Sequence, residues 1–259
     1  MKTLTAPIAV FDSGAGGIGV LQEVQRMLPH ENLFYFGDSA MAPYGERSTP
    51  EVRELVLRHA AHLLRFSKAL VLACNTATAI AAEPLRARYP QIPIIGMEPA
   101  LRPAVHVCTH PHVLVLATAA TLREKKFASL LQDCAKNATV TALAAPGIVR
   151  LVEANAADSP EMDAYLAALL APLTQPPDAV VLGCTHFPFA LPAFRRVLGA
   201  RVPVFDGAHG TARQTARRLS ATGLCNPQGA RGAVLLASSH AAALPLYRRL
   251  LAQKSPDTV

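Results

Sequence analysis

Short apolar runs alternate with longer amphipathic segments along most of the chain. Residues 49–66, TPEVRELVLRHAAHLLRF, carry apolar side chains at the spacing of three to four residues that is typical of a helix. The apolar runs are rich in Val, Ile, Leu and Phe, which is typical of buried strands. We expect strands at 8–11, 32–36, 69–73, 92–96, 112–117, 138–143, 179–183, 202–205 and 232–238.

This alternation predicts an α/β fold built from doubly wound, mostly parallel sheets. Helices cover both faces of a parallel sheet, so its strands read as continuous apolar runs. Nine strands exceed one comfortable compact unit, and we therefore expect two pseudo-symmetric α/β domains. In such folds functional side chains lie at the carboxyl ends of the strands, so the active site is expected in the cleft between the domains.

A weak internal repeat indicates how the chain divides. Residues 69–78, ALVLACNTAT, and residues 179–188, AVVLGCTHFP, share a strand, a small residue, a cysteine and two hydrogen-bonding residues. If each half is a doubly wound unit, Cys74 and Cys184 end equivalent strands and face each other across one cleft. We expect a first domain at 1–98 and 210–259, which holds Asp12 and Cys74, and a second at 99–209, which holds Cys184 and His186.

The excess of basic residues does not indicate a nucleic-acid partner. The net charge is +7. The arginine doublets at 195–196, 217–218 and 248–249 lie on separate helical segments, without a longer basic run or interleaved aromatic residues. We interpret them as solvated helix faces and expect no nucleic-acid partner.

The amino-terminal residues and the cysteines bear on location and redox state. The first apolar run is broken by Asp12, so neither a signal peptide nor a membrane span is predicted. We expect a cytoplasmic protein without a membrane partner. The five cysteines, at 74, 108, 134, 184 and 225, lack paired short spacings, so we expect free thiols rather than a disulfide framework or a zinc ribbon.

The glycine-rich motif after the first strand invites a dinucleotide-binding interpretation. GAGGIG at 14–19 satisfies that pattern, and Asp38 falls near the position of a ribose-binding acid. However, Asp12 would place a carboxylate close to the pyrophosphate, where the site should favour anions. We therefore expect a flexible tight turn, or backbone amides that open with Ser13 onto a small substrate.

The motif Cys-x-His occurs twice, at 108–110 and at 184–186, and only the second follows a strand. The first lies in a connector, where solvated polar residues are expected. A zinc ion could be held by Cys74, Cys184 and His186, but no local spacing resembles a metal site. We favour thiol chemistry and expect no metal.

Two opposed thiols in a polar cleft suit one kind of chemistry best. A reversible disulfide usually forms within a Cys-x-x-Cys pair, which the chain lacks. A nucleophilic cysteine activated by histidine, as in thiol hydrolases, leaves the second thiol unexplained. Removal of a proton from one face of a carbon and its return on the other face needs two acid/base groups, and a pair of cysteines meets this need.

Six motifs occur in the order and at approximately the spacing found in glutamate racemases. They are FDSGAGGIGVL, GDSAMAPYGERS, ACNTAT, GMEPA, APGIVRLVE and LGCTHFP, and together they span nearly the whole chain. The sequence therefore resembles the glutamate racemase family. The resemblance implies an enzyme without a cofactor that interconverts L- and D-glutamate and supplies D-glutamate for bacterial peptidoglycan, with Cys74 and Cys184 as its acid/base thiols. It also implies glutamate as the small-molecule substrate and a homodimer.

The same resemblance assigns further residues around the two thiols. Asp12 and His186 are implied as helpers, one on each side, and Glu153 joins this catalytic group. Asp38 matches a further acidic position, and a structural role is an equal alternative for Asp38 and Glu153. The implied substrate-binding pairs are Asp12 with Ser13, Tyr44 with Gly45, Asn75 with Thr76, and Thr185 with His186.

The lysines agree with an enzyme that uses no pyridoxal phosphate. That cofactor needs a Schiff-base lysine, and none of the six lysines is expected at the end of a strand. Without this electron sink, hydrogen bonds and the exclusion of water must stabilise a carbanion-like transition state. We expect Asn75, Thr76, Thr121 and Thr185 to donate these hydrogen bonds.

Two departures from the family pattern leave the substrate open. Phe187 stands where the family commonly has Tyr, and Met97 precedes Glu98 where an aliphatic residue is usual. Aspartate racemases are the nearest alternative, although they usually carry Glu at the position of His186. A Cys-dependent hydrolase and a basic α/β binding protein without chemistry are the alternatives from other classes.

Overall fold

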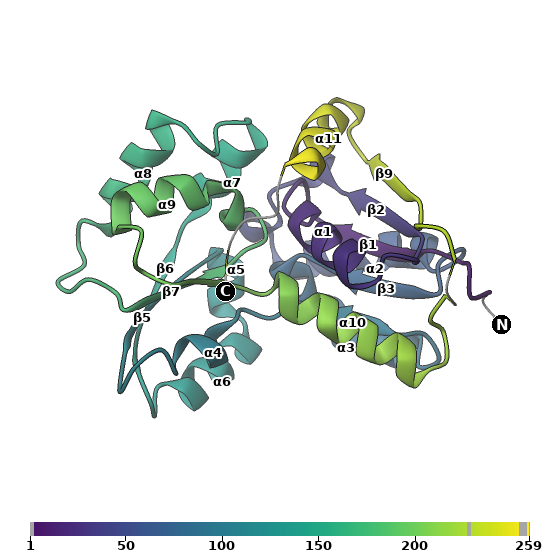
Figure 1. The fold of residues 1–259 in the computed structure, drawn as a ribbon, viewed down its shortest axis with the longest axis horizontal. Helices are drawn as coiled ribbons and strands as arrows, with labels where there is room; N and C mark the ends of the chain where they lie inside the picture. Colours follow the sequence, from purple (N-terminus) through teal and green to yellow (C-terminus); the bar gives the residue numbers. More distant parts are fainter. Residues whose placement is uncertain (1–2, 227–228, 254–257, 259) are drawn as a thin grey trace.

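The computed structural model describes residues 3–226, 229–253 and 258, which form two parallel β-sheets in two lobes (Figure 1). The strands are β1 (Ile8–Asp12), β2 (Leu33–Gly37), β3 (Ala69–Leu72), β4 (Ile94–Gly96), β5 (His112–Ala117), β6 (Thr139–Ala144), β7 (Ala179–Gly183), β8 (Val204–Asp206) and β9 (Val234–Ser238). The first sheet has the order β4-β3-β1-β2-β9 and the second the order β6-β5-β7-β8. The nine predicted strands and the doubly wound α/β fold are confirmed.

Helices cover both faces of each sheet. On the first sheet, one face packs against α1 (Ile18–Met27), α10 (Ala208–Ala221) and α11 (Leu244–Ala252), and the other against α2 (Thr49–Leu63) and α3 (Asn75–Arg88). On the second sheet, one face packs against α7 (Pro146–Glu153), α8 (Pro160–Leu170) and α9 (Leu191–Leu198), and the other against α4 (Leu101–Ala104) and α6 (Lys125–Cys134). The remaining short elements are α5 (Ala119–Arg123), η1 (Ser39–Met41), η2 (Tyr44–Glu46), η3 (Phe187–Ala190) and η4 (Ala241–Ala243). None of the helices described is long and apolar enough to span a bilayer.

Strand β1 illustrates why a predicted strand can be apolar at consecutive positions. Ile8 and Val10 are fully buried in the cluster that contains α1, α10 and α11, whereas Ala9 and Phe11 are buried in the cluster that contains α2 and α3. Successive side chains of a strand point to opposite faces of the sheet. A strand covered on both sides therefore has no position left for a solvated residue.

The two sheets repeat one plan. In the first, Phe11 of β1 lies beside Leu72 of β3, and in the second, Leu116 of β5 lies beside Leu182 of β7. Cys74 lies two positions after Leu72, and Cys184 lies two positions after Leu182. The register therefore agrees with the internal repeat, because the two cysteines follow equivalent strands.

Within the described residues the chain passes from the first sheet to the second between β4 and β5, and leaves the second sheet between β8 and α10. The two crossings lie against each other. A Cβ atom on Gly207 would be 2.5 Å from the carbonyl oxygen of Glu98, so only glycine lets the two backbones come this close. The domain limits expected at residues 98 and 210 stay a prediction.

Candidate active site

Both cysteines of the repeat line one small pocket between the two sheets. Cys74 directly precedes α3 and Cys184 directly follows β7, and their exposed fractions are 6% and 7%. The empty volume of the pocket is about 290 Å³. It is lined by Ser13, Pro43, Tyr44, Gly45, Cys74, Asn75, Thr76, Thr118, Val149, Cys184, Thr185 and His186. The pocket thus joins residues from both halves of the chain.

The Cys74 thiol occupies the position before the first turn of α3. Its backbone is extended, and its sulfur accepts a hydrogen bond from the N–H of Ala77 at 3.4 Å. Burial raises the pKa of the Cys74 thiol to about 12, and the nearby carboxylate of Asp12 adds to this effect. Near neutral pH, Cys74 is therefore a neutral thiol in the empty pocket.

A chain of side chains leads away from the Cys184 sulfur. Nδ1 of His186 lies 3.8 Å from this sulfur, and Nε2 lies 2.7 Å from Oε1 of Glu153. The same oxygen accepts the N–H of Ala15 at 2.7 Å. Helix α7 carries Glu153 as its last residue, so the packing of this helix positions the carboxylate.

The histidine and the glutamate form a charged pair beside Cys184. Burial lowers the pKa of His186, but its hydrogen bonds to Cys184 and Glu153 outweigh burial and raise the pKa well above the ordinary value. Burial raises the pKa of Glu153, but the hydrogen bond from His186 outweighs it, and the pKa is lowered. A protonated imidazole therefore stands next to one thiol and not next to the other.

Asp12 is fully buried and lies behind the pocket lining. Its Oδ1 accepts the N–H of Gly14 at 2.9 Å, and its Oδ2 accepts the hydroxyl of Thr185 at 3.0 Å. Burial raises the pKa of Asp12, and the charge of His186 and these two hydrogen bonds offset only part of the rise. The carboxylate links the end of β1 in the first half to the residue after Cys184 in the second.

Three threonine hydroxyls connect the two halves on the other side of the pocket. Thr118 Oγ1 lies 3.0 Å from Oγ1 of both Thr76 and Thr121. Thr118 lines the pocket, whereas Thr121, which was expected to donate to the substrate, is outside the lining. The sequence analysis missed Thr118. The internal repeat could have identified it, because Thr118 follows β5 as Ser13 follows β1.

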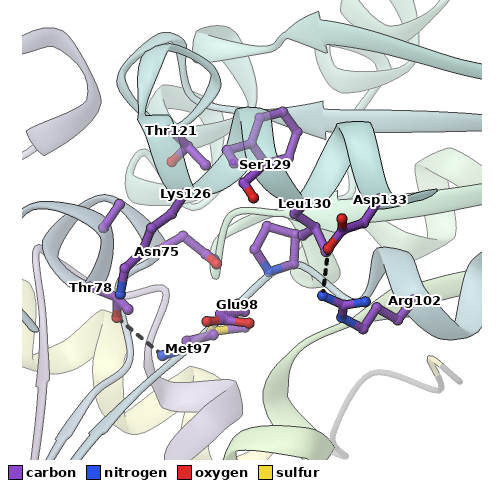
Figure 2. Close-up of a pocket in the computed structure, with 13 residues that line it drawn as sticks. Asn75, Thr78, Met97, Glu98, Arg102, Thr121, Lys126, Ser129, Leu130 and Asp133 are labelled. Carbon is purple, nitrogen blue, oxygen red and sulfur yellow. Dashed lines mark hydrogen bonds and ion pairs between the residues drawn. The ribbon is translucent and has the colours of Figure 1, made fainter. Parts of the chain in front are cut away.

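Asn75 separates this pocket from a larger one. The second pocket has an empty volume of about 770 Å³, and Asn75, Glu98, Arg102, Thr121 and Lys126 are among its lining residues (Figure 2). The side-chain oxygen and nitrogen of Asn75 are buried and have no hydrogen-bond partner within the described part of the chain. Because buried polar groups normally have partners, this amide is suited to bind a ligand.

The segment that contains Tyr44 and Gly45 forms another wall. The Tyr44 hydroxyl donates to Oδ2 of Asp38 at 2.7 Å, and burial together with this bond raises the pKa of Tyr44. A Cβ atom on Gly45 would be 2.7 Å from Cβ of Thr118, so the segment packs directly against the second half. Asp38 is buried behind Tyr44 and is absent from the pocket lining.

The glycines at 14–19 have a packing role in addition to the expected turn. A Cβ atom on Gly16 would be 2.5 Å from both Nδ1 of His186 and Oγ1 of Thr185. The backbone of the turn therefore approaches the second half more closely than any other residue would allow.

The remaining candidate residues lie away from the pocket. Lys68, the lysine nearest to a strand start, is buried and forms an ion pair with Glu31 at 2.5 Å. Cys108 is exposed, in agreement with a connector position. Phe187 is fully buried and does not line the pocket. Among the residues that the structure describes, no group of three or more His, Cys, Asp or Glu side chains could hold a metal ion.

Comparison with known proteins gives consistent matches. A family model described as Asp/Glu/Hydantoin racemase matches residues 18–215. A curated glutamate racemase of Pseudomonas aeruginosa is 46% identical over 86% of this chain and 85% of its own length. One of Clostridium perfringens is 43% identical over 83% of each chain.

Solved structures agree with these sequences. Glutamate racemase from Thermus thermophilus, in complex with β-chloro-D-alanine, has a TM-score of 0.80 at 34% identity, and the match covers 100% of this chain and 97% of that one. Escherichia coli glutamate racemase, in complex with L-glutamate and the activator UDP-MurNAc-ala, has a TM-score of 0.82 at 30% identity, with 95% of each chain covered.

The fold and these matches define the class of the protein as an amino-acid racemase, which is an isomerase. Within that class, the chain belongs to the Asp/Glu/Hydantoin racemase family.

Proposed function

We propose that this enzyme interconverts L- and D-glutamate without a cofactor, by a two-base mechanism that uses Cys74 and Cys184. The observation that carries the proposal is that both thiols, which follow equivalent strands, line one small pocket. The choice of glutamate is supported by curated relatives named glutamate racemase at 40% to 46% identity.

Each turnover removes one proton and returns another. One sulfur, as a thiolate, takes the α-hydrogen as a proton, and the C–H electron pair stays on the substrate, delocalised towards the α-carboxylate. The other sulfur, as a thiol, donates its proton to the opposite face of the α-carbon, which inverts the configuration. The first sulfur is then a thiol and the second a thiolate, so the charge of the complex is unchanged and the reverse reaction starts from the other side.

Substrate binding helps Cys74 to ionise. In the empty pocket, burial and the charge of Asp12 hold the Cys74 pKa at about 12, which leaves little thiolate. An ammonium group that binds near Asp12 favours the charged forms of Asp12 and Cys74, because opposite charges within a few ångströms stabilise each other. The substrate therefore lowers the pKa of the thiol that reacts with it.

His186 exchanges a proton with the sulfur of Cys184. Its Nδ1 is close enough to the sulfur to pass a proton to it or take one from it. Glu153 orients the ring through Nε2 and stabilises its protonated form. In this role Glu153 acts through His186 and does not contact the substrate.

The pocket lining holds the two carboxylates and the ammonium group of glutamate. The buried amide of Asn75 has no hydrogen-bond partner among the described residues, which supports its assignment to substrate binding. The remaining binding positions are Ser13, Tyr44, Gly45, Thr76 and Thr185, which all line the pocket.

Proton NMR in deuterated water tests this proposal directly. The purified enzyme is mixed, without added cofactor, with L-glutamate, D-glutamate, L-aspartate or D-aspartate. We expect the α-proton signal to disappear with both glutamates and to persist with both aspartates. Exchange with the aspartates alone would keep the mechanism and change the substrate, whereas no exchange from folded, reduced protein would contradict the proposed activity.

We further propose that the enzyme works in the cytoplasm, as a homodimer, and supplies D-glutamate for peptidoglycan. The bacterial relatives support this biological role. The gene should restore growth to a bacterial strain that requires external D-glutamate, whereas a Cys74→Ala variant should not. Light scattering on the purified protein tests the dimer, and a monomeric mass would contradict it.

A further inference from the structure

A histidine on α2 contacts the pocket wall through Asp38. Nε2 of His59 lies 3.1 Å from Oδ2 of Asp38, the oxygen that also accepts the Tyr44 hydroxyl. Burial raises the pKa of Asp38, but the hydrogen bonds from His59 and Tyr44 outweigh it, so that the pKa is lowered. Asp38 is 1% exposed, so the side chains of His59, Tyr44 and Ser239 provide the hydrogen bonds that water would give to an exposed carboxylate.

The His59 ring packs against two neighbouring phenylalanines. Its centroid lies 5.7 Å from that of Phe11 with an interplanar angle of 28°, and 4.9 Å from that of Phe36 with an angle of 40°. Phe11 belongs to β1 and Phe36 to β2, so the ring rests on the face of the first sheet. Its nitrogen therefore points to Asp38 from a rigid base.

The segment that Asp38 holds has little freedom on its other side. Tyr44 and Gly45 line the small pocket, and Gly45 packs against Thr118 of the second half with no room for a Cβ atom. A shift of the Tyr44 ring would therefore move the pocket wall and its contact with Thr118 together. His59 does not line the pocket, so it acts on the wall only through other residues.

We propose that His59 is a positioning residue of the racemase site. It orients the Asp38 carboxylate, which holds Tyr44 and so fixes the segment that closes the pocket against Thr118. His59 belongs to none of the six motifs and lies within the amphipathic pattern of α2. The kinetic test of this inference rests on the proposed function, but a second measurement does not.

The first test compares three variants by steady-state kinetics. His59→Phe keeps a ring packed against Phe11 and Phe36 but removes the nitrogen that faces Asp38. We expect its KM for glutamate to rise about tenfold while kcat changes by less than about threefold, because a hydrogen bond to a charged group is lost from substrate positioning. His59→Gln, whose amide nitrogen can replace Nε2, should recover most of the loss. His62→Ala, an exposed histidine on the same helix, should leave both constants unchanged.

A second variant distinguishes a positioning effect from a folding defect. Tyr44→Phe removes the other donor to the same carboxylate oxygen and should raise KM to a similar extent. The double variant with His59→Phe should cost less than the product of the two single effects, since both residues act through one atom. A fall in kcat at unchanged KM, full additivity, or an equal effect of His62→Ala would overturn the inference.

A measurement without substrate separates the two proposals. Alkylation of Cys74 by iodoacetamide, located by mass spectrometry, and amide hydrogen exchange over residues 44–46 should both be faster in His59→Phe and normal in His59→Gln. If the unmodified enzyme does not racemise glutamate, the proposed function fails, while these rates still test His59. Equal rates in His59→Phe and the unmodified enzyme would contradict the positioning role.

Discussion

The two halves of the molecule share a backbone plan and surround their cysteines with different chemistry. The equivalent registers of β1 with β3 and of β5 with β7 make Asp12 and Ala117 corresponding residues, because each follows the strand position beside the aligned leucine. A carboxylate therefore lies in the first half where a methyl group lies in the second. In the same way, Thr76 and His186 each stand two residues after their cysteine.

This difference shows that the repeated backbone and the side chains that are not repeated contribute separately to the site. The repeated strands bring two sulfur atoms to one pocket, which is a matter of backbone geometry. The side chains that differ set the charge around each sulfur: a carboxylate and a cluster of hydroxyls on the Cys74 side, and an imidazole paired with a carboxylate on the Cys184 side. On the proposed mechanism, the two enantiomers then meet thiols that are equivalent in position and differ in the charged groups beside them.

Removal of either sulfur should have the largest effect. We expect Cys74→Ala and Cys184→Ala each to reduce racemisation by about 10³-fold or more, since a positioned acid/base group contributes about 10²- to 10⁴-fold. Exchange of the α-proton in deuterated water should be more impaired for one enantiomer in the first variant and for the other enantiomer in the second. Cys108→Ala, at an exposed cysteine, is the control. Equal residual exchange of both enantiomers in either variant would remove the two-thiol mechanism.

Loss of the carboxylate beside His186 should come next. Glu153→Gln should lower kcat by about 10- to 100-fold, which is less than the about 10²- to 10⁴-fold effect of a direct acid/base group, because Glu153 acts through His186. It also removes a group that raises the pKa of His186, so the alkaline limb of the pH profile of kcat/KM should move to lower pH. Glu54→Gln, at an exposed glutamate, should change neither quantity. An unchanged alkaline limb in Glu153→Gln would show that His186 does not titrate in the reaction.

A smaller effect is expected where the hydroxyl cluster joins the halves. Thr118→Val keeps the shape of the side chain and removes the oxygen shared by Thr76 and Thr121. We expect KM to rise by about three- to tenfold, equivalent to the net value of one buried hydrogen bond, with little change in kcat. Thr222→Val, an exposed threonine at the end of α10, is the matched control. A KM equal to that of the control would exclude Thr118 from substrate positioning.

The smallest expected effect is on the pH dependence of stability. The lowered pKa of Glu153 stabilises the fold above its ordinary value of 4.5, and this is lost as pH falls through the lowered pKa. The raised pKa of His186 stabilises the fold fully below its ordinary value of 6.5, and this is lost as pH rises through the raised pKa. Glu153→Gln should therefore lower Tm by about 2–4 °C between these values, and by less in stronger acid or in alkali. Calorimetry across the pH range checks this, and a pH-independent difference would contradict it.

The strands and the pairing of the two cysteines were accessible to sequence reasoning because both depend on local pattern. Continuous apolar runs are what a sheet covered on both faces requires, and the first four residues of β1 show this. The internal repeat then brought Cys74 and Cys184 to one pocket without any structure. Motif resemblance added Asn75, Thr185 and His186, which line that pocket.

Contacts between distant segments were not accessible in this way. The hydrogen bond from His186 to Glu153 depends on how α7 packs, and the one from His59 to Asp38 depends on the angle of α2 on its sheet. His59 reads as an ordinary polar position of an amphipathic helix until its partners are known. Thr121 was expected as a donor and Thr118, three residues before it, was not, because the sequence does not tell which of the two hydroxyls faces the small pocket.

The two adjoining crossings at Gly207 and Glu98 have a mechanical consequence. A single connection between two bodies acts as a swivel and leaves their relative orientation free. Two connections that touch restrict the relative motion of the two sheets. Rotation about the line through both connections is the least restricted motion, and twisting or sliding of one sheet against the other is costly. On the proposed mechanism, this rotation would let the two sulfur atoms separate to admit a substrate and then return to the same alignment.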